Sequence, residues 1–168
     1  MATWKMIGDT TFNQDIDATS TTQKAPLGAI VKGRDIDNTG YGDAEFIYGV
    51  GVASTAAGDL VTIDGSGYTT ARASADAVGP CGVAMSANVA SQYGWYAVKG
   101  TVLITSGDVA DAGALFLTST AGSVDDAFVD GDLVFNAFAV AADSGGTTLS
   151  RINYPHTNNG ASQSTAPQ

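Results

Sequence analysis

The chain has 168 residues, of which 44% are hydrophobic and 14% charged, so it is long enough to bury a core in one compact domain. Seven basic residues against seventeen acidic ones give a net charge of −10, which repels a phosphate backbone and argues against nucleic acid as a partner. No apolar run approaches the ~20 residues that cross a bilayer, and the first residues lack the apolar stretch of a secretion signal. We therefore expect a protein made in the cytoplasm, with no membrane partner.

The composition favours β-structure. The chain holds 27 Ala, 21 Gly, 19 Thr and 14 Val, but only 7 Leu and a single glutamate, Glu45. Thr and Val favour strands, Gly and Asp favour turns, and strong helix formers other than Ala are scarce. We predict an all-β fold of short strands joined by many turns.

Residues 1–26 form a polar segment rich in Thr, Asp and Gln, with isolated apolar residues set into it. This is not the pattern of a domain core, so we predict an extended N-terminal arm whose apolar side chains dock on the chain's own body or on a neighbouring molecule. We interpret these side chains as anchors to a partner, because isolated apolar residues on a polar arm have little other use. The predicted anchors are Trp4, Met6, Ile7, Phe12 and Ile16.

The central part of the chain reads as strands and turns. Apolar residues alternate or run continuously in 45–52 and 101–105, which predicts core strands. Gly49 and Gly51 inside the first of these indicate a bend, a bulge or a close backbone approach.

A weak internal repeat at an offset of 55 residues supports two strand units. Each unit would contain a tight turn, a strand, a Gly turn, an Asp-rich link and two more strands. We predict that the two units form one pseudo-symmetric β-body, either a barrel or a sandwich. The predicted strands are 60–63, 82–85 and 95–99 in the first unit, and 115–118, 134–140 and 148–153 in the second.

The sequence contains no group of residues typical of a catalytic site. The only histidine, His156, follows Pro155 in a polar tail, where a triad would need a rigidly held base. The only cysteine, Cys81, has no nearby base or resolving cysteine, so we expect a buried, inert thiol. One Cys and one His cannot build the usual zinc sites.

The Asp-rich stretch 35–45 resembles a calcium loop only in part. Asp35, Asp37, Thr39 and Gly40 fit its first positions, but Phe46 stands where the last carboxylate is needed. We prefer a surface loop, and we interpret the other acidic residues as solvated turns. No phosphate-binding motif is present. We therefore predict no enzyme activity, no metal and no cofactor.

The aromatic stretch 93–100 reads as a strand in which Trp95 and Ala97 share one face while Tyr96 and Val98 share the other. We expect core packing, with a ring on the rim that binds sugar or protein as the alternative.

The succession of short motifs resembles the head decoration, or cement, proteins of tailed bacteriophages over residues 27–155. The motifs that carry the resemblance are 57–61, 79–84, 93–100, 112–117 and 151–155. The resemblance implies a small β-barrel or β-tulip-like body, here residues 27–154. Residues 155–168 lie beyond this body, and their small and polar residues predict a C-terminal tail. The resemblance carries over no catalytic residues.

From this resemblance we expect a structural protein on the outer surface of the virion that binds the expanded capsid and bridges its subunits. The implied partners are the major capsid protein and further copies of the chain, as a homotrimer. A virion fibre or tail component, or a module that binds host-surface glycans, is the alternative.

Overall fold

The computed structural model describes residues 3–8, 12–37, 39–52 and 54–158. These residues form eleven β-strands and contain no helix, hence none that could span a membrane. All ladders between the strands are antiparallel, and they join in one large sheet that does not close. The all-β prediction is confirmed. The strands are β1 (Trp4–Ile7), β2 (Ile30–Asp35), β3 (Asp43–Val50), β4 (Leu60–Ile63), β5 (Thr70–Arg72), β6 (Gly79–Ala84), β7 (Tyr93–Thr105), β8 (Gly113–Leu117), β9 (Val124–Asp125), β10 (Leu133–Ala139) and β11 (Thr147–Thr157).

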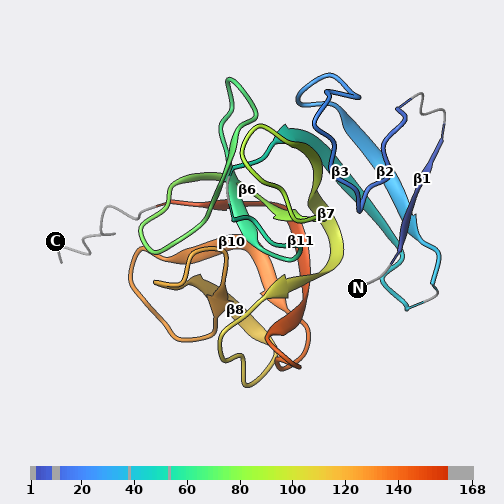
Figure 1. The fold of residues 1–168 in the computed structure, drawn as a ribbon. Helices are drawn as coiled ribbons and strands as arrows, with labels where there is room; N and C mark the ends of the chain where they lie inside the picture. Colours follow the sequence, from blue (N-terminus) through green and yellow to red (C-terminus); the bar gives the residue numbers. More distant parts are fainter. Residues whose placement is uncertain (1–2, 9–11, 38, 53, 159–168) are drawn as a thin grey trace, which may run out of the picture.

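Strand β7 joins the two parts of the molecule. Its first half pairs with β3 and β6, and its second half pairs with β11. Figure 1 shows it between the β1–β2–β3 group and the group with β8, β10 and β11. The sequence predicted two separate strands here, whereas the chain runs on through Gly100, whose φ of +126° marks an irregular point that other residues rarely adopt.

The strands after residue 59 pair in two similar sets. In the first set β4 pairs with β5 and β6, and β6 pairs with β7. In the second set β8 pairs with β9 and β10, and β10 pairs with β11. The two sets meet where β7 pairs with β11, and β11 also pairs briefly with β6.

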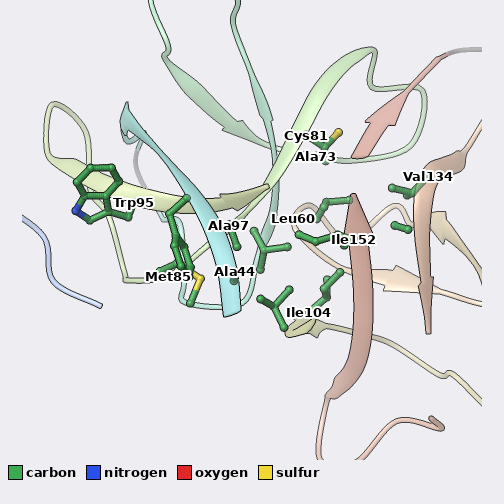
Figure 2. Close-up of a cluster of buried hydrophobic side chains, with 14 of the residues drawn as sticks. Ala44, Leu60, Ala73, Cys81, Met85, Trp95, Ala97, Ile104, Val134 and Ile152 are labelled. Carbon is green, nitrogen blue, oxygen red and sulfur yellow. The ribbon is translucent and has the colours of Figure 1, made fainter. Parts of the chain in front are cut away.

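The core has two clusters of buried side chains. Trp95 and Ala97 belong to the larger cluster, and Tyr96 and Val98 belong to the smaller one. The alternation predicted for this strand is therefore confirmed, and both large rings are fully buried, which excludes a role for either on a rim. Figure 2 shows part of the larger cluster, with Leu60, Ala97, Ile104 and Ile152 gathered between the strands.

The sequence predicted an arm and a tail outside the body, but residues near both ends of the chain form strands of the sheet. β1 adds a strand to the sheet edge by pairing with β2, and β11 continues through Thr157, three residues into the predicted tail. Residues 1–2 and 9–11 of the predicted arm, and 159–168 of the predicted tail, lie outside the described residues.

Candidate functional site

The N-terminal segment docks on the chain's own body, one of the two possibilities that its sequence left open. Trp4 is 4% exposed, and its ring lies 5.2 Å from that of Phe46 in an edge-on arrangement. Phe12 packs on Trp95 at 6.0 Å between ring centroids, and Ile16 is fully buried. These three anchors thus contact one surface of the larger core cluster.

The remaining two predicted anchors are only partly buried. Met6 is partly buried against the core, and Ile7 is half-buried opposite Lys32 on the outer face of the sheet. A cavity of about 470 Å³ lies between β1 and residues 12–17. Trp4 and Ile16 both line this cavity.

Polar contacts hold this segment in register. The amide of Gln14 donates to the carbonyls of Ala18 and Tyr93, each at 2.9 Å, and its Oε1 accepts from the hydroxyl of Tyr48 at 2.6 Å. The indole N–H of Trp95 donates to the carbonyl of Gln14 at 3.2 Å. Buried hydrogen bonds of this kind are costly to lose, so they fix the segment in one position.

In the Asp-rich loop after β2, backbone N–H groups donate hydrogen bonds to the carboxylate of Asp35. Asp35 accepts hydrogen bonds from the N–H groups of Asp37, Thr39 and Tyr41, and from the hydroxyl of Thr39. The Thr39 hydroxyl is the main reason that the pKa of Asp35 lies below its usual value. Within the described residues, no group of three or more His, Cys, Asp or Glu side chains is placed to hold a metal ion. The geometry is that of a surface loop.

The single cysteine is buried, as predicted. Cys81 is 1% exposed, and burial raises the pKa of its thiol to about 11. His156 lies on β11 and not in a tail, since it pairs with Phe135 and Pro80; it is exposed, and its ring stacks on that of Phe135 with 5.1 Å between centroids. Both residues line the apolar pocket described below.

Exposed apolar side chains concentrate on the outer face of β10 and β11, which we call the β10 face. Phe138 is 46% exposed, although strand alternation alone would place one of two phenylalanines three residues apart inside. A bulge lies between Phe135 and Ala137, and Asn136 has a φ of +59°. The bulge changes the alternation and brings both rings to the outside. The β10 face comprises Phe135, Phe138, Val140 and His156.

A second irregularity lies directly opposite the first. Tyr154 on β11 has a φ of +52°, a region that bulky residues rarely occupy. Its hydroxyl donates to Oε2 of Glu45 on β3 at 2.5 Å, and Lys99 lies 3.5 Å from the other carboxylate oxygen. The hydrogen bond to Tyr154 is the main cause that lowers the pKa of Glu45. Backbone strain of this kind is often kept where a surface must have a defined shape.

An apolar pocket of about 380 Å³ opens beside Tyr154. Its walls come from β3, β4, the β4–β5 turn, β6, β7 and β11, so residues distant in sequence form one concave surface. Pockets of this size with mostly apolar walls are typical ligand or side-chain receptors. The lining residues are Ile47, Ile63, Gly65, Tyr68, Pro80, Cys81, Val98, Tyr154, Pro155 and His156.

The sequence did not single out the exposed aromatic residues. Phe135 and Phe138 lie in the predicted strand 134–140, where alternation would turn one of the two rings inward, and only the bulge exposes both. Phe128 carried a usable signal, because an aromatic residue within Asp125-Asp126-Ala-Phe-Val-Asp130 has few apolar neighbours to pack on.

Comparisons with known proteins assign no family. No family model matches the chain, and no curated protein matches it. The surfaces described above therefore carry the functional argument.

Proposed function

We propose that the protein is a structural virion protein that binds the outer surface of the expanded phage capsid and stabilises it by bridging capsid subunits. The resemblance of residues 27–155 to head decoration proteins suggests this role. The observation that carries it is the β10 face, a group of exposed apolar and aromatic side chains on paired strands. Aromatic residues concentrate at protein interfaces, and exposed apolar patches commonly mark them.

The mechanism needs no chemical step. A protein that binds only the expanded lattice stabilises that lattice by mass action, and several linked contacts raise the effective concentration of each one. The partners would be the major capsid protein and further copies of the chain, arranged as a trimer. The acidic charge of −10 suits a position outside the shell, away from packaged DNA.

We also propose that the body is a barrel-like unit made of two pseudo-repeats. The matching ladders support the repeat, since β4, β5, β6 and β7 pair with one another as β8, β9, β10 and β11 do. The mutual pairing of β6, β7 and β11 supports the barrel-like curvature.

The N-terminal segment has a smaller part in this proposal than its sequence predicted. Trp4 and Ile16 are occupied by the chain's own core, so we assign capsid or neighbour contact to Ile7 and to the exposed parts of Met6 and Phe12. Deleting residues 1–26 would remove core side chains as well as anchors. Surface variants are therefore the better test.

The test measures binding of the purified protein to expanded capsids that lack it. Phe138→Ser should weaken binding by about tenfold or more, because truncating a central interface aromatic costs at least ~1.4 kcal/mol. Val78→Ser removes an apolar side chain that is even more exposed, away from the β10 face, and should leave binding unchanged. Absence of the protein from purified virions, together with failure to bind capsids, would overturn the capsid role.

A glycan-binding module is the second candidate, because the stacked rings of Phe135 and His156 offer a flat surface of the kind on which sugars pack. Binding of the purified protein to glycans, with no affinity for capsids, would favour this function or a role in a virion fibre or tail.

A further inference from the structure

Phe128 is the most exposed large apolar side chain among the described residues. It is 78% exposed, and its ring lies in an edge-on arrangement with that of Phe116 at 5.5 Å between centroids. Exposing an aromatic ring to this extent costs solvation free energy that binding to an apolar surface would recover.

The loop that carries Phe128 is held in shape before any binding. The N–H of Ala127 donates to the Asp125 carboxylate at 3.1 Å, and the N–H of Ala110 donates to the Asp126 carboxylate at 2.8 Å. At the far end, the N–H of Asp132 donates to the carbonyl of Val129 at 3.2 Å. A braced loop loses little conformational entropy when it docks.

The loop is also strongly acidic. Asp125, Asp126 and Asp130 flank the ring in the sequence, and Asp108 accepts a backbone hydrogen bond from Asp126. Burial, followed by repulsion from its acidic neighbours, raises the pKa of Asp125. A partner for this loop should therefore offer an apolar receptor with basic groups beside it.

The apolar pocket beside Tyr154 has that chemistry. It opens on the outer face of the sheet, and Tyr154 in its wall contacts Glu45, which pairs with Lys99 and lies opposite Lys32. Strand register and exposure place five of the seven basic residues on this outer face; Asp43 and Glu45 are the acidic residues paired among them, and Asp64 is a further acidic residue, next to Gly65 in the pocket wall. The five are Lys5, Lys32, Arg34, Lys99 and Arg151.

We propose that copies of this chain associate head to tail, with Phe128 of one copy inserted in the apolar pocket of the next. Phe128 does not line its own pocket, so knob and pocket are separate surfaces, and each copy uses both. Contacts of this kind close into a ring when the rotation between copies allows it, and a ring of three is the trimer of the proposed function. The inference rests on the self-association part of that function and does not depend on the capsid.

The first test measures solution mass by analytical ultracentrifugation. The wild-type chain should form a discrete oligomer, and Phe128→Ser should weaken association by at least about tenfold. Val89→Ser, a change at an exposed apolar residue outside the loop, the pocket and the basic outer face, should leave the mass unchanged. A wild-type chain that is monomeric at millimolar concentration, or an unaltered mass for Phe128→Ser, would overturn the proposal.

The pocket is tested at Gly65, which lines it and where an added Cβ meets no atom within 4 Å. Gly65→Glu puts a negative charge at the pocket and should weaken association. Gly65→Lys, a side chain of similar length with the opposite charge, should retain it. Equal loss from both would overturn the charge argument.

Mixing the two defective variants separates this geometry from other modes of association. Phe128→Ser keeps an intact pocket, and Gly65→Glu keeps an intact Phe128, so together they form one good contact and stop at a dimer. A mixture that stays monomeric, or that restores the wild-type mass, contradicts the head-to-tail arrangement. Capsid binding by Phe138→Ser is measured separately, so failure of the capsid role and failure of this inference give different results.

Discussion

The hydroxyl of Tyr154 donates a hydrogen bond of 2.5 Å to Glu45, a residue 109 positions earlier in the chain. Glu45 is the only glutamate, and the bond ties β11 to β3 across β7. It also fixes the ring that forms one wall of the apolar pocket.

Removing this hydroxyl should change the titration of Glu45. In Tyr154→Phe the pKa of Glu45 should rise toward its ordinary value, because the main cause that lowers it is gone. Carbon NMR of glutamate-labelled protein follows this one carboxyl without overlap. Tyr68→Phe, in the same pocket but without a hydrogen bond to Glu45, should leave that pKa unchanged; an equal shift in both variants would contradict the assignment.

The lowered pKa of Glu45 also predicts how the stability of the fold changes with pH. The folded-state pKa of Glu45 is lowered, so the charged carboxylate stabilises the fold above the unfolded-state pKa, and this contribution is lost as the pH falls through the folded-state pKa. The loss on acidification should be smaller in Tyr154→Phe than in the wild type.

Gly33→Ala should destabilise the fold by displacing the N-terminal segment. A Cβ at this position would lie 2.5 Å from Cδ1 of Ile16 and 2.9 Å from Cε2 of Phe46. We expect a loss of ~1–3 kcal/mol in the free energy of unfolding, measured by urea denaturation. Gly113→Ala, where a Cβ meets no atom within 4 Å, should change it by less than ~0.5 kcal/mol.

A second change identifies the cause of this loss. Shortening the opposing side chain in Gly33→Ala/Ile16→Val should recover part of the lost stability, because the two sites then conflict less. Strictly additive losses would show that Ile16 is not the obstacle.

Tyr96→Phe should destabilise the smaller core cluster without changing its shape. The Tyr96 hydroxyl accepts hydrogen bonds from Nδ2 of Asn88 at 2.7 Å and from the hydroxyl of Thr70 at 3.1 Å. Both donors are buried, and Asn88 Oδ1 has no hydrogen-bond partner within the described residues. We expect a loss of ~1–3 kcal/mol in urea denaturation, and none of this size for Tyr68→Phe.

Cys81 should resist alkylation in the folded protein. Its pKa of about 11 leaves almost no thiolate at pH 8, and its side chain is buried. Iodoacetamide followed by mass spectrometry should label Cys81 only when the protein is unfolded. Ser119→Cys adds an exposed thiol as a control, and that site should be labelled in the folded state.

The raised pKa of the Cys81 thiol predicts a loss of stability in strong alkali. Its folded-state pKa is raised, so the neutral thiol contributes stability below the unfolded-state pKa, and this contribution is lost as the pH rises through about 11. In Cys81→Ala this component of the alkaline loss should be absent.

Composition and alternation were enough to predict the β-class, several strands and the buried cysteine. The strand Leu60–Ile63 has the predicted bounds, and Trp95 and Tyr96 lie on the opposite faces that alternation requires. The backbone at Gly51 passes close to Asn88, and a close backbone approach was one of the three explanations predicted for the glycines within 45–52. These features depend on neighbours in the sequence, which is why they could be read from it.

The β10 face and the apolar pocket depend on tertiary structure. Ile16 is buried because distant Gly33 leaves room for it, and Phe135 and Phe138 share one face because a bulge shifts the register of β10. Tyr154 meets Glu45 only after three strands have paired. Local residue preferences select strands and turns, but the register between distant strands decides which side chains meet and which remain exposed.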